Sequence, residues 1–251
     1  ATRLRRTYTS DTFETLPYAF AEDVMDRERD VSDSIINPEA DAAALITRRL
    51  KLAREVRINT QVMTSGNWTT TSAVTTKWNT ADGTSVVIEQ DINVAKEVIH
   101  KQVGIMPNTI VIPFHISLWA AQDPKIRDLI KHTQSDLLVN GSLPPVLFGL
   151  NVIIPLSLNN EADPGVATES IDRLWDDNSV WVGYVNPNTS PNKGELSSLY
   201  TFRFPVGGNL DVAISRYRDD SIRATVVEGE MEEVSKVISA GAGYVLTGAF
   251  A

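Results

Sequence analysis

The sequence predicts an α+β fold, in which helices and strands do not alternate regularly. One long amphipathic helical pattern follows Asn37-Pro38, which indicates a long helix near the start of the chain. Segments rich in β-branched and aromatic residues lie near both ends, which indicates strands there. No internal repeat and no regular strand–helix order occur, so a parallel α/β sheet is not expected.

The first segment has the composition of extended structure. Residues 3–9 and 13–20 are rich in Thr, Tyr and Phe, and the polar Ser10-Asp11-Thr12 lies between them. We expect two strands joined by a turn, or one long hairpin arm. Such an arm needs another surface to pack against, because an isolated hairpin is marginally stable in water. The mixed charges of residues 22–33 indicate a solvated exit from the arm.

A helix is expected over residues 38–62. Asn37 is a good N-cap and Pro38 suits the first helical position. At 1.5 Å per residue this helix would be roughly 36 Å long, which is long for a domain of this size. Arg49 is the one charged residue within an otherwise apolar arc of Ala42, Leu45, Ile46, Leu50, Leu52, Ala53 and Val56. The opposite side carries Arg48, Lys51, Arg54, Glu55 and Asn59.

The middle of the chain predicts a connection followed by helices and strands. Residues 65–85 are rich in Thr, Ser and Gly and indicate a connection. A second helix is expected over about residues 91–102, because Ile88, Ile92, Ala95 and Ile99 recur at helical spacing, and Gly104 would end it. Short helices are expected from Ser117 through Ala121 and from Pro124 through Lys131. The strand-like ranges are 109–114, 146–156, 179–185, 199–204, 210–217, 222–228 and 231–239, and the small apolar residues 240–251 close the chain.

Composition excludes several classes of function. The net charge of −9 and the pI of about 4.9 argue against a general nucleic-acid binder, which needs a basic surface. The chain has no Cys, so disulfides, iron–sulfur clusters, thiolate zinc sites and cysteine nucleophiles are excluded together. No apolar run approaches the roughly 20 residues of a membrane span. The first residues lack an apolar signal core and an initiator Met, so we expect a processed, truncated or incompletely represented start.

The search for catalytic motifs finds none. His100, His115 and His132 lack the spacing of a helical zinc site, and no H-E-x-x-H or G-x-S-x-G occurs. Gly241-Ala242-Gly243 lacks the Lys of a phosphate-binding loop, so close packing of small residues explains it better. We therefore predict no catalytic, cofactor-binding or metal-ligating residue, and no cofactor.

Two further groups of residues are explained better by solvation or packing than by ligand binding. The basic run Arg48, Arg49, Lys51, Arg54 and Arg57 could touch nucleic acid. A solvated face, or pairing with acidic neighbours in the same assembly, fits so acidic a chain better. The five Trp residues are expected to be packing anchors rather than stacking platforms for bases.

Several stretches, taken in order, resemble the major capsid proteins of tailed bacteriophages with the Hong Kong 97-like fold. The first stretch runs from Tyr8-Thr9-Ser10 through Asn37-Pro38 to a helix ending Leu52-Ala53-Arg54-Glu55-Val56. The second is the helix to Gly104, then Met106-Pro107-Asn108-Thr109 and an apolar strand. The third begins Phe148-Gly149-Leu150, and the fourth is the terminal strand block with its Gly-rich close. The resemblance covers nearly the whole chain, and the order of its motifs makes it specific.

The resemblance implies five segments. Residues 1–35 would be an extended E-loop arm, and residues 36–85 the spine helix of the peripheral domain with its connection. Residues 86–205 would be the axial domain, which surrounds pentamer and hexamer centres. Residues 206–239 would be the return strands of the peripheral domain, and 240–251 a C-terminal segment. Family members usually carry an arm before the E-loop, and little precedes Arg3 here, so the upstream part is expected to be cleaved or missing.

The resemblance also implies a function. Many copies would form the pentamers and hexamers of an icosahedral phage head that encloses double-stranded DNA without sequence-specific binding. Portal, scaffolding and decoration proteins would be further partners, no membrane would be involved, and the protein would belong to the virion after assembly in the bacterial host cytoplasm. The expected subunit contacts are Tyr8, Phe13, Tyr18, Phe20, Arg48 and Arg54.

Two other functions stay open at this point. An encapsulin-like nanocompartment shares the fold but encloses cargo enzymes, so the contents of purified shells would separate it from a phage head. A soluble hydrolase with an unrecognised carboxylate site would form a small oligomer and show turnover. The missing motifs disfavour the hydrolase.

Overall fold

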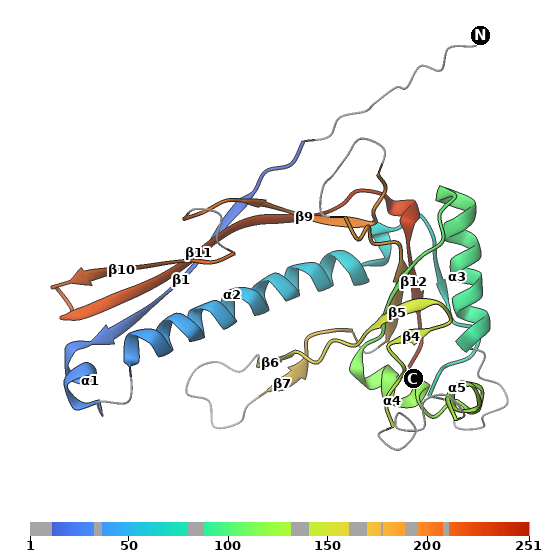
Figure 1. Cartoon of the computed structure of the whole chain (residues 1–251), viewed down its shortest axis with the longest axis horizontal. Helices are drawn as coiled ribbons and strands as arrows, with labels where there is room; N and C mark the ends of the chain where they lie inside the picture. Colours follow the sequence, from blue (N-terminus) through green and yellow to red (C-terminus); the bar gives the residue numbers. More distant parts are fainter. Residues whose placement is uncertain are drawn as a thin grey trace, which may run out of the picture. The chain divides into compact units, whose positions relative to one another are not determined.

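The computed structural model describes residues 12–32, 37–79, 88–131, 141–160, 170–176, 178–188, 195–207 and 211–250 (Figure 1). The chain forms two compact units, which are described separately. The first unit comprises Ala1–Ala53 and Thr201–Ser235, and the second comprises Arg54–Tyr200 and Lys236–Ala251. The five segments predicted from the sequence are named by their place in an assembled shell, so they stay predictions.

A four-stranded sheet forms one layer of the first unit. Its strands are β1 (Leu16–Met25), β9 (Leu199–Phe204), β10 (Ala213–Asp219) and β11 (Ala224–Val237). The long β11 lies at the centre and pairs antiparallel with β1 on one side and with β10 on the other, and it also pairs with β9. The hairpin arm expected from the sequence stays a prediction. Its second strand pairs with β11, about 200 residues later in the chain, and residues 3–9 lie outside the described ranges.

Strand β11 replaces two predicted strands. We expected separate strands over 222–228 and 231–239, with Gly229 between them. The structure has one strand of 14 residues through this point. Gly229 has a packing reason instead: a Cβ there would lie 2.4 Å from Ile46 Cγ2 and 3.2 Å from Leu50 Cδ1. Glycine thus lets helix and sheet approach closely.

The long helix is confirmed as α2 (Pro38–Met63). The Asn37 side chain accepts a hydrogen bond from the Ala40 amide at 3.2 Å, as its N-cap role predicts. Ala42, Ile46 and Leu50 are buried and form a core with Val24, Val227 and Met231. The buried stripe is narrower than predicted, because the side chains of Leu45 and Val56 are 37% and 39% exposed.

A short helix follows β1, where a solvated exit was expected. Strand β1 continues to Met25, and α1 (Asp26–Val31) begins at the next residue. The charges that suggested a solvated segment lie at the start of α1, where acidic Asp26 and Glu28 suit the positive end of the helix dipole. The prediction that residues 22–33 are solvated holds for α1, which buries no residue, but the continued strand and the helix were not predicted.

A six-stranded mixed sheet forms the central layer of the second unit. Its strand order is β2-β12-β8-β3-β5-β4. The bounds are β2 (Thr71–Ala73), β12 (Gly243–Thr247), β8 (Ser179–Gly183), β3 (Thr109–Val111), β5 (Leu150–Ile153) and β4 (Val146–Leu147). The remaining elements of the unit are η1 (Ser65–Asn67), η2 (Ala240–Ala242) and the ribbon of β6 (Leu158–Asn160) with β7 (Ile171–Arg173). Every residue of β8 is buried, as expected for a central strand.

Each face of this sheet is covered. The larger core includes Ile110, Val182 and Leu246 from the sheet and Ile92 and Ile99 from α3 (Ile88–Val103). The alternate strand residues Val111, Trp181 and Val245 form a second core with Val62 and Trp68. The alternation follows from the two-residue period of a strand. Trp68, Trp78 and Trp181 are buried packing residues, as predicted.

Asp91 ties the Thr-rich connection to α3. It is 4% exposed, and its carboxylate accepts hydrogen bonds from Trp78 Nε1 at 3.1 Å and from the Thr75 amide and hydroxyl at 3.3 and 3.0 Å. The carboxylate therefore satisfies three donors at once.

The helix expected over about residues 91–102 is confirmed as α3, and its four apolar positions are buried. Gly104 follows the helix with a φ of 73°.

Two local predictions in the second unit need correction. Helix α4 (Phe114–Ala120) begins at Phe114, so Ser117 lies inside it and its hydroxyl donates to the Phe114 carbonyl at 2.6 Å. The α5 helix (Pro124–Ile130) begins at Pro124 as predicted. The strand expected over 146–156 is divided into β4 and β5 by a tight turn at Phe148 and Gly149, with φ of 50° and 78°.

Candidate subunit-contact surface

The predicted contact residues occupy three places. Phe13 precedes β1, is 49% exposed and stacks on Phe202 with ring centroids 4.1 Å apart. Tyr18 is half-buried and packs against the core of the first unit, whereas Phe20 on the same strand is 42% exposed. Arg48 is exposed on α2. Arg54 is half-buried and belongs to the second unit, and Tyr8 lies outside the described residues.

The sheet of the first unit has an acidic outer surface, which sequence analysis missed. Val227, Gly229 and Met231 of β11 face α2, so the alternate residues Glu228, Glu230 and Glu232 point the opposite way. Strand register places small neighbours beside them, because directly paired residues share a face. We call this surface the acidic face: Glu228, Glu230 and Glu232, flanked by Ala19, Ala21, Ala213 and Ser215.

The alternation of Glu in the sequence Glu228-Gly229-Glu230-Met231-Glu232 was the signal that could have revealed this face. It was obscured by the expected break near Gly229. Glu232 accepts a hydrogen bond from the Thr15 hydroxyl. Within the described ranges no ion pair involves Glu228 or Glu230. Their charges are therefore available to another molecule.

The opposite surface of the first unit is basic. Arg48 and Lys51 lie on the side of α2 turned away from the buried Ala42, Ile46 and Leu50, and both are exposed. We call these two residues the basic face. In the part of the chain that the structure describes, neither side chain forms an ion pair.

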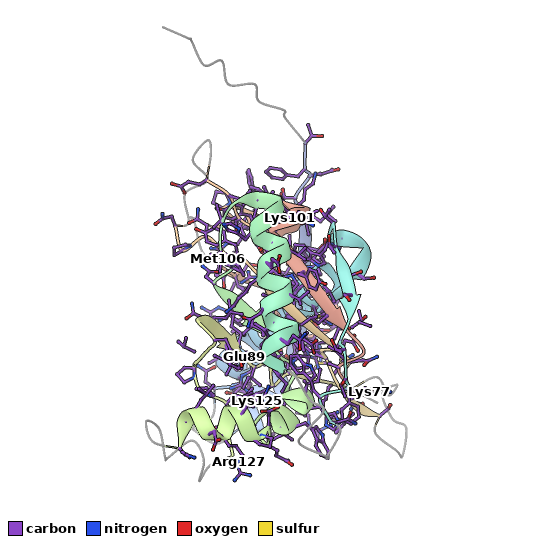
Figure 2. All side chains as sticks on the ribbon, turned by 90° about the vertical axis from the view of Figure 1, so that its right-hand side faces the viewer. Lys77, Glu89, Lys101, Met106, Lys125 and Arg127 are labelled. Carbon is purple, nitrogen blue, oxygen red and sulfur yellow. The ribbon has the colours of Figure 1, made fainter. Side chains whose placement is uncertain are left out.

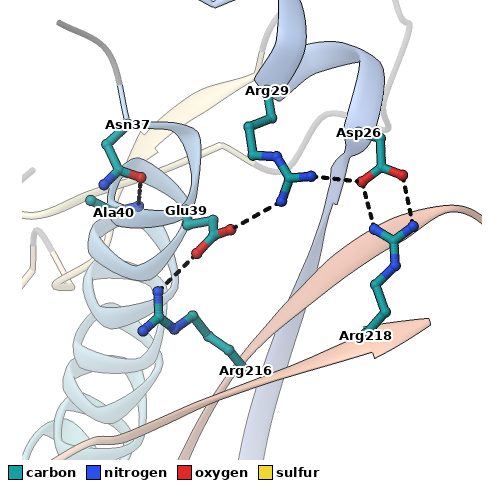
Figure 3. Close-up of polar contacts among 7 residues, drawn as sticks. All are labelled: Asp26, Arg29, Asn37, Glu39, Ala40, Arg216 and Arg218. Atoms are coloured by element: carbon teal, nitrogen blue, oxygen red, sulfur yellow. Dashed lines mark hydrogen bonds and ion pairs between the residues drawn. The ribbon is translucent and has the colours of Figure 1, made fainter. Parts of the chain in front are cut away.

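A charge network ties α1 to its neighbours (Figure 3). Arg218 of β10 forms two ion-pair hydrogen bonds with Asp26, one of them at 2.7 Å. Arg29 bridges Asp26 and Glu39 at 3.3 and 3.8 Å, and Arg216 also binds Glu39 at 2.8 Å. The hydrogen bond from Arg218 lowers the pKa of Asp26, and the same contact raises the pKa of Arg218. Hydrogen bonds from Ser221 lower the pKa of the adjacent turn residue Asp219.

The Asp26 pair is expected to make the first unit sensitive to acid. Because its folded-state pKa lies below the ordinary 3.8, the carboxylate stabilises the fold above that value and loses this contribution as pH falls through the lowered pKa. An Asp26→Asn variant should therefore melt below wild type at pH 6, and the difference should shrink below about pH 4. Asp30→Asn, at an exposed position of the same helix, is the control. A pH-independent difference would contradict the prediction.

The second unit carries exposed charged side chains along α3 (Figure 2). Glu89 lies near the first turn of α3 and Lys101 near its last, which suits the helix dipole. Lys96 of the same helix donates to the Phe148 carbonyl, and burial lowers its pKa. Among the described residues, no three His, Asp or Glu side chains are grouped so that they could hold a metal ion.

An apolar hollow of about 200 Å³ lies beside the β6–β7 ribbon, lined by Phe114, Leu156, Leu158 and Trp175 among others. Glu55 accepts hydrogen bonds from Ser157 Oγ at 2.6 Å and Trp175 Nε1 at 2.7 Å, which holds two of the segments that line it. Leu156 and Leu158 are 68% and 56% exposed, so this surface also offers apolar area. None of the helices in the described ranges is long and apolar enough to cross a bilayer.

Comparison with known proteins identifies the fold. No protein-family model matches the sequence, and no curated protein matches it. Among solved structures, a phage-related protein of Bordetella bronchiseptica is similar with a TM-score of 0.70 and 20% identity over 96% of this chain and 78% of that one. A structure from Mycobacterium phage Che8 has a TM-score of 0.64 and 12% identity over 98% and 78% of the two chains.

The capsid structure of cyanophage P-SCSP1u is also similar, with a TM-score of 0.58 and 11% identity over 100% of this chain and 81% of that one. These likenesses extend over nearly the whole chain and include both units. The chain therefore has the mixed α+β fold of Hong Kong 97-like phage capsid structures, and the fold expected from the resemblance is confirmed.

Proposed function

We propose that this chain is the major capsid protein of a tailed bacteriophage, a structural shell protein without catalytic activity. The observation that carries the proposal is a likeness over 96% of the chain to a phage-related protein, joined by a likeness over the whole chain to a phage capsid structure. Copies of the chain would form pentamers and hexamers of an icosahedral head that encloses double-stranded DNA.

The chemistry of the chain supports this role. The net charge of −9 suits a shell that repels packaged DNA and lets it move, without sequence-specific contacts. Exposed aromatic and aliphatic side chains, such as Phe13, Phe20 and Leu156, are available for burial between subunits. Portal, scaffolding and decoration proteins would be further partners. The protein would reside in the virion after assembly in the bacterial cytoplasm.

We assign the elements to shell domains as follows. Residues 1–35 form the extended arm, residues 36–85 and 206–239 the peripheral domain around α2, and residues 86–205 the axial domain, with 240–251 as the C-terminal segment. The proposed subunit contacts are Tyr8, Phe13, Tyr18, Phe20, Arg48 and Arg54. The exposure of Phe13, Phe20 and Arg48 supports a contact role for these three.

The test is the size and content of the purified assembly, measured by negative-stain microscopy and light scattering. Closed shells tens of nanometres across, or ring-like capsomers, are the expected result. Nuclease-protected DNA inside shells would support a phage head, whereas packaged cargo protein would favour a nanocompartment. If the full-length protein stays monomeric or dimeric at high concentration, the proposal fails.

Phe20 provides a test of the contact surface itself. A Phe20→Ser variant should fold normally, because the ring is 42% exposed within the chain, yet it should need several-fold more protein to assemble. The physical reason is the apolar area that the ring would bury against a neighbour. Static light scattering during a dilution series measures the threshold, and thermal melting checks the fold. Assembly at the wild-type threshold would remove Phe20 from the contact surface.

A further inference from the structure

The two charged surfaces of the first unit complement each other. Glu228 and Glu230 stand about 7 Å apart along β11, the repeat of two strand residues. Arg48 and Lys51 are three residues apart on α2, where neighbouring side chains stand about 5–6 Å apart. Small residues flank the carboxylates, so a helix could approach them closely. The charges are opposite and the spacings match.

These surfaces cannot meet within one chain. The buried stripe of α2 packs against the Val227 and Met231 side of the sheet. The carboxylates lie on the opposite side of the sheet, and Arg48 and Lys51 lie on the opposite side of the helix. The acidic and basic faces therefore point away from each other, on the two outer surfaces of a helix-on-sheet unit. Any contact between them joins two copies.

We propose that the acidic face of one copy binds the basic face of α2 in a second copy. This inference rests on the proposed assembly function and names the partner of its contact surface. Because the two faces of one copy point in opposite directions, the contact is head-to-tail rather than self-complementary. A head-to-tail contact builds closed rings when its rotation closes. A single exposed ion pair is weak, so the contact gains strength from its repetition through an assembly.

Charge reversal tests the pairing. One variant carries Glu228→Lys with Glu230→Lys, and a second carries Arg48→Glu with Lys51→Glu. Each alone should need at least about tenfold more protein to assemble, because like charges then face each other. A variant that carries all four substitutions should recover assembly to within about threefold of wild type, because the two reversed faces again complement each other at every contact. Raising the salt concentration should weaken wild-type assembly in the same assay.

Controls separate the possible failures. Glu89→Lys with Glu97→Lys, on the outer side of α3, changes the net charge as much as the first variant and should assemble like wild type. Thermal melting establishes that each variant is folded. Assembly of either reversed variant at the wild-type threshold, or failure of the variant with all four substitutions to recover, overturns the pairing while leaving the proposed function intact.

Two further outcomes would also overturn the pairing. If the Arg48→Glu, Lys51→Glu variant forms normal shells that hold less DNA, the basic face binds phosphates of the packaged nucleic acid instead. If the wild-type chain forms neither shells nor capsomers, the proposed function fails and the pairing fails with it.

Discussion

A Gly229→Val variant is expected to lose about 3 kcal/mol of stability in the first unit. The new Cβ would lie 2.4 Å from Ile46 Cγ2 and 3.1 Å from Ile214 Cδ1, and valine adds two methyl groups beyond it. Ile46 cannot turn aside easily, because a β-branched side chain on a helix has one favoured rotamer. The helix would have to move off the sheet. Hydrogen exchange of β1, β10 and β11 amides, together with thermal melting, measures the effect.

Ala21→Val is the matched control for this variant. Ala21 lies on β1 in the same sheet, is exposed and pairs with Glu228 on the outer side. Valine suits a strand there and meets no helix, so the change in stability should stay within about 0.5 kcal/mol. Similar loss in both variants would show that close helix–sheet approach at Gly229 is not the reason for the glycine.

An Asp91→Ala variant should destabilise the second unit by about 3 kcal/mol. Trp78 Nε1 and both donors of Thr75 would lose their shared acceptor in a position where water is largely excluded. Release of the Trp78 ring should move tryptophan emission to longer wavelength, because this ring is 2% exposed in the native protein. Urea unfolding followed by fluorescence measures both effects.

Two variants sharpen the interpretation of Asp91. Asp91→Asn keeps the shape but places an amide N–H among donors, so it should recover only part of the lost stability. Glu97→Ala removes an exposed carboxylate from the same helix and should be nearly neutral. If Asp91→Ala were as stable as Glu97→Ala, the carboxylate would not be what fixes residues 75–78 to α3.

Local signals predicted the two long helices well, whereas α1 was missed and the start of α4 was misplaced. Asn37-Pro38 marked the start of α2, the apolar spacing of Ile88 to Ile99 marked α3, and both follow from neighbouring residues. The partner of β1 could not be predicted in this way, because β11 lies about 200 residues later and strand pairing leaves no local mark. The packing role of Gly229 could not be predicted for a related reason, because it depends on Ile46 in a distant element.

The contact residues follow from the resemblance to phage capsid proteins, and they stay predictions. Phe13 and Phe20 are exposed, which is compatible with a contact role. The acidic face was not identified, because it depends on which side of β11 packs against α2. Glu at every second position predicts one acidic side of a sheet only when these positions belong to one continuous strand.

The strand order has a consequence for the newly made chain. The first unit needs β11, which begins at Ala224, and the sheet of the second unit places β12, ending at Thr247, between β2 and β8. The first core therefore stays open on the ribosome until β11 has been synthesised, and the second core until β12 has been synthesised. High contact order of this kind slows folding and prolongs exposure of apolar strands. A chain that ends before Ala224 lacks both β11 and β12, so it completes neither core and should not fold.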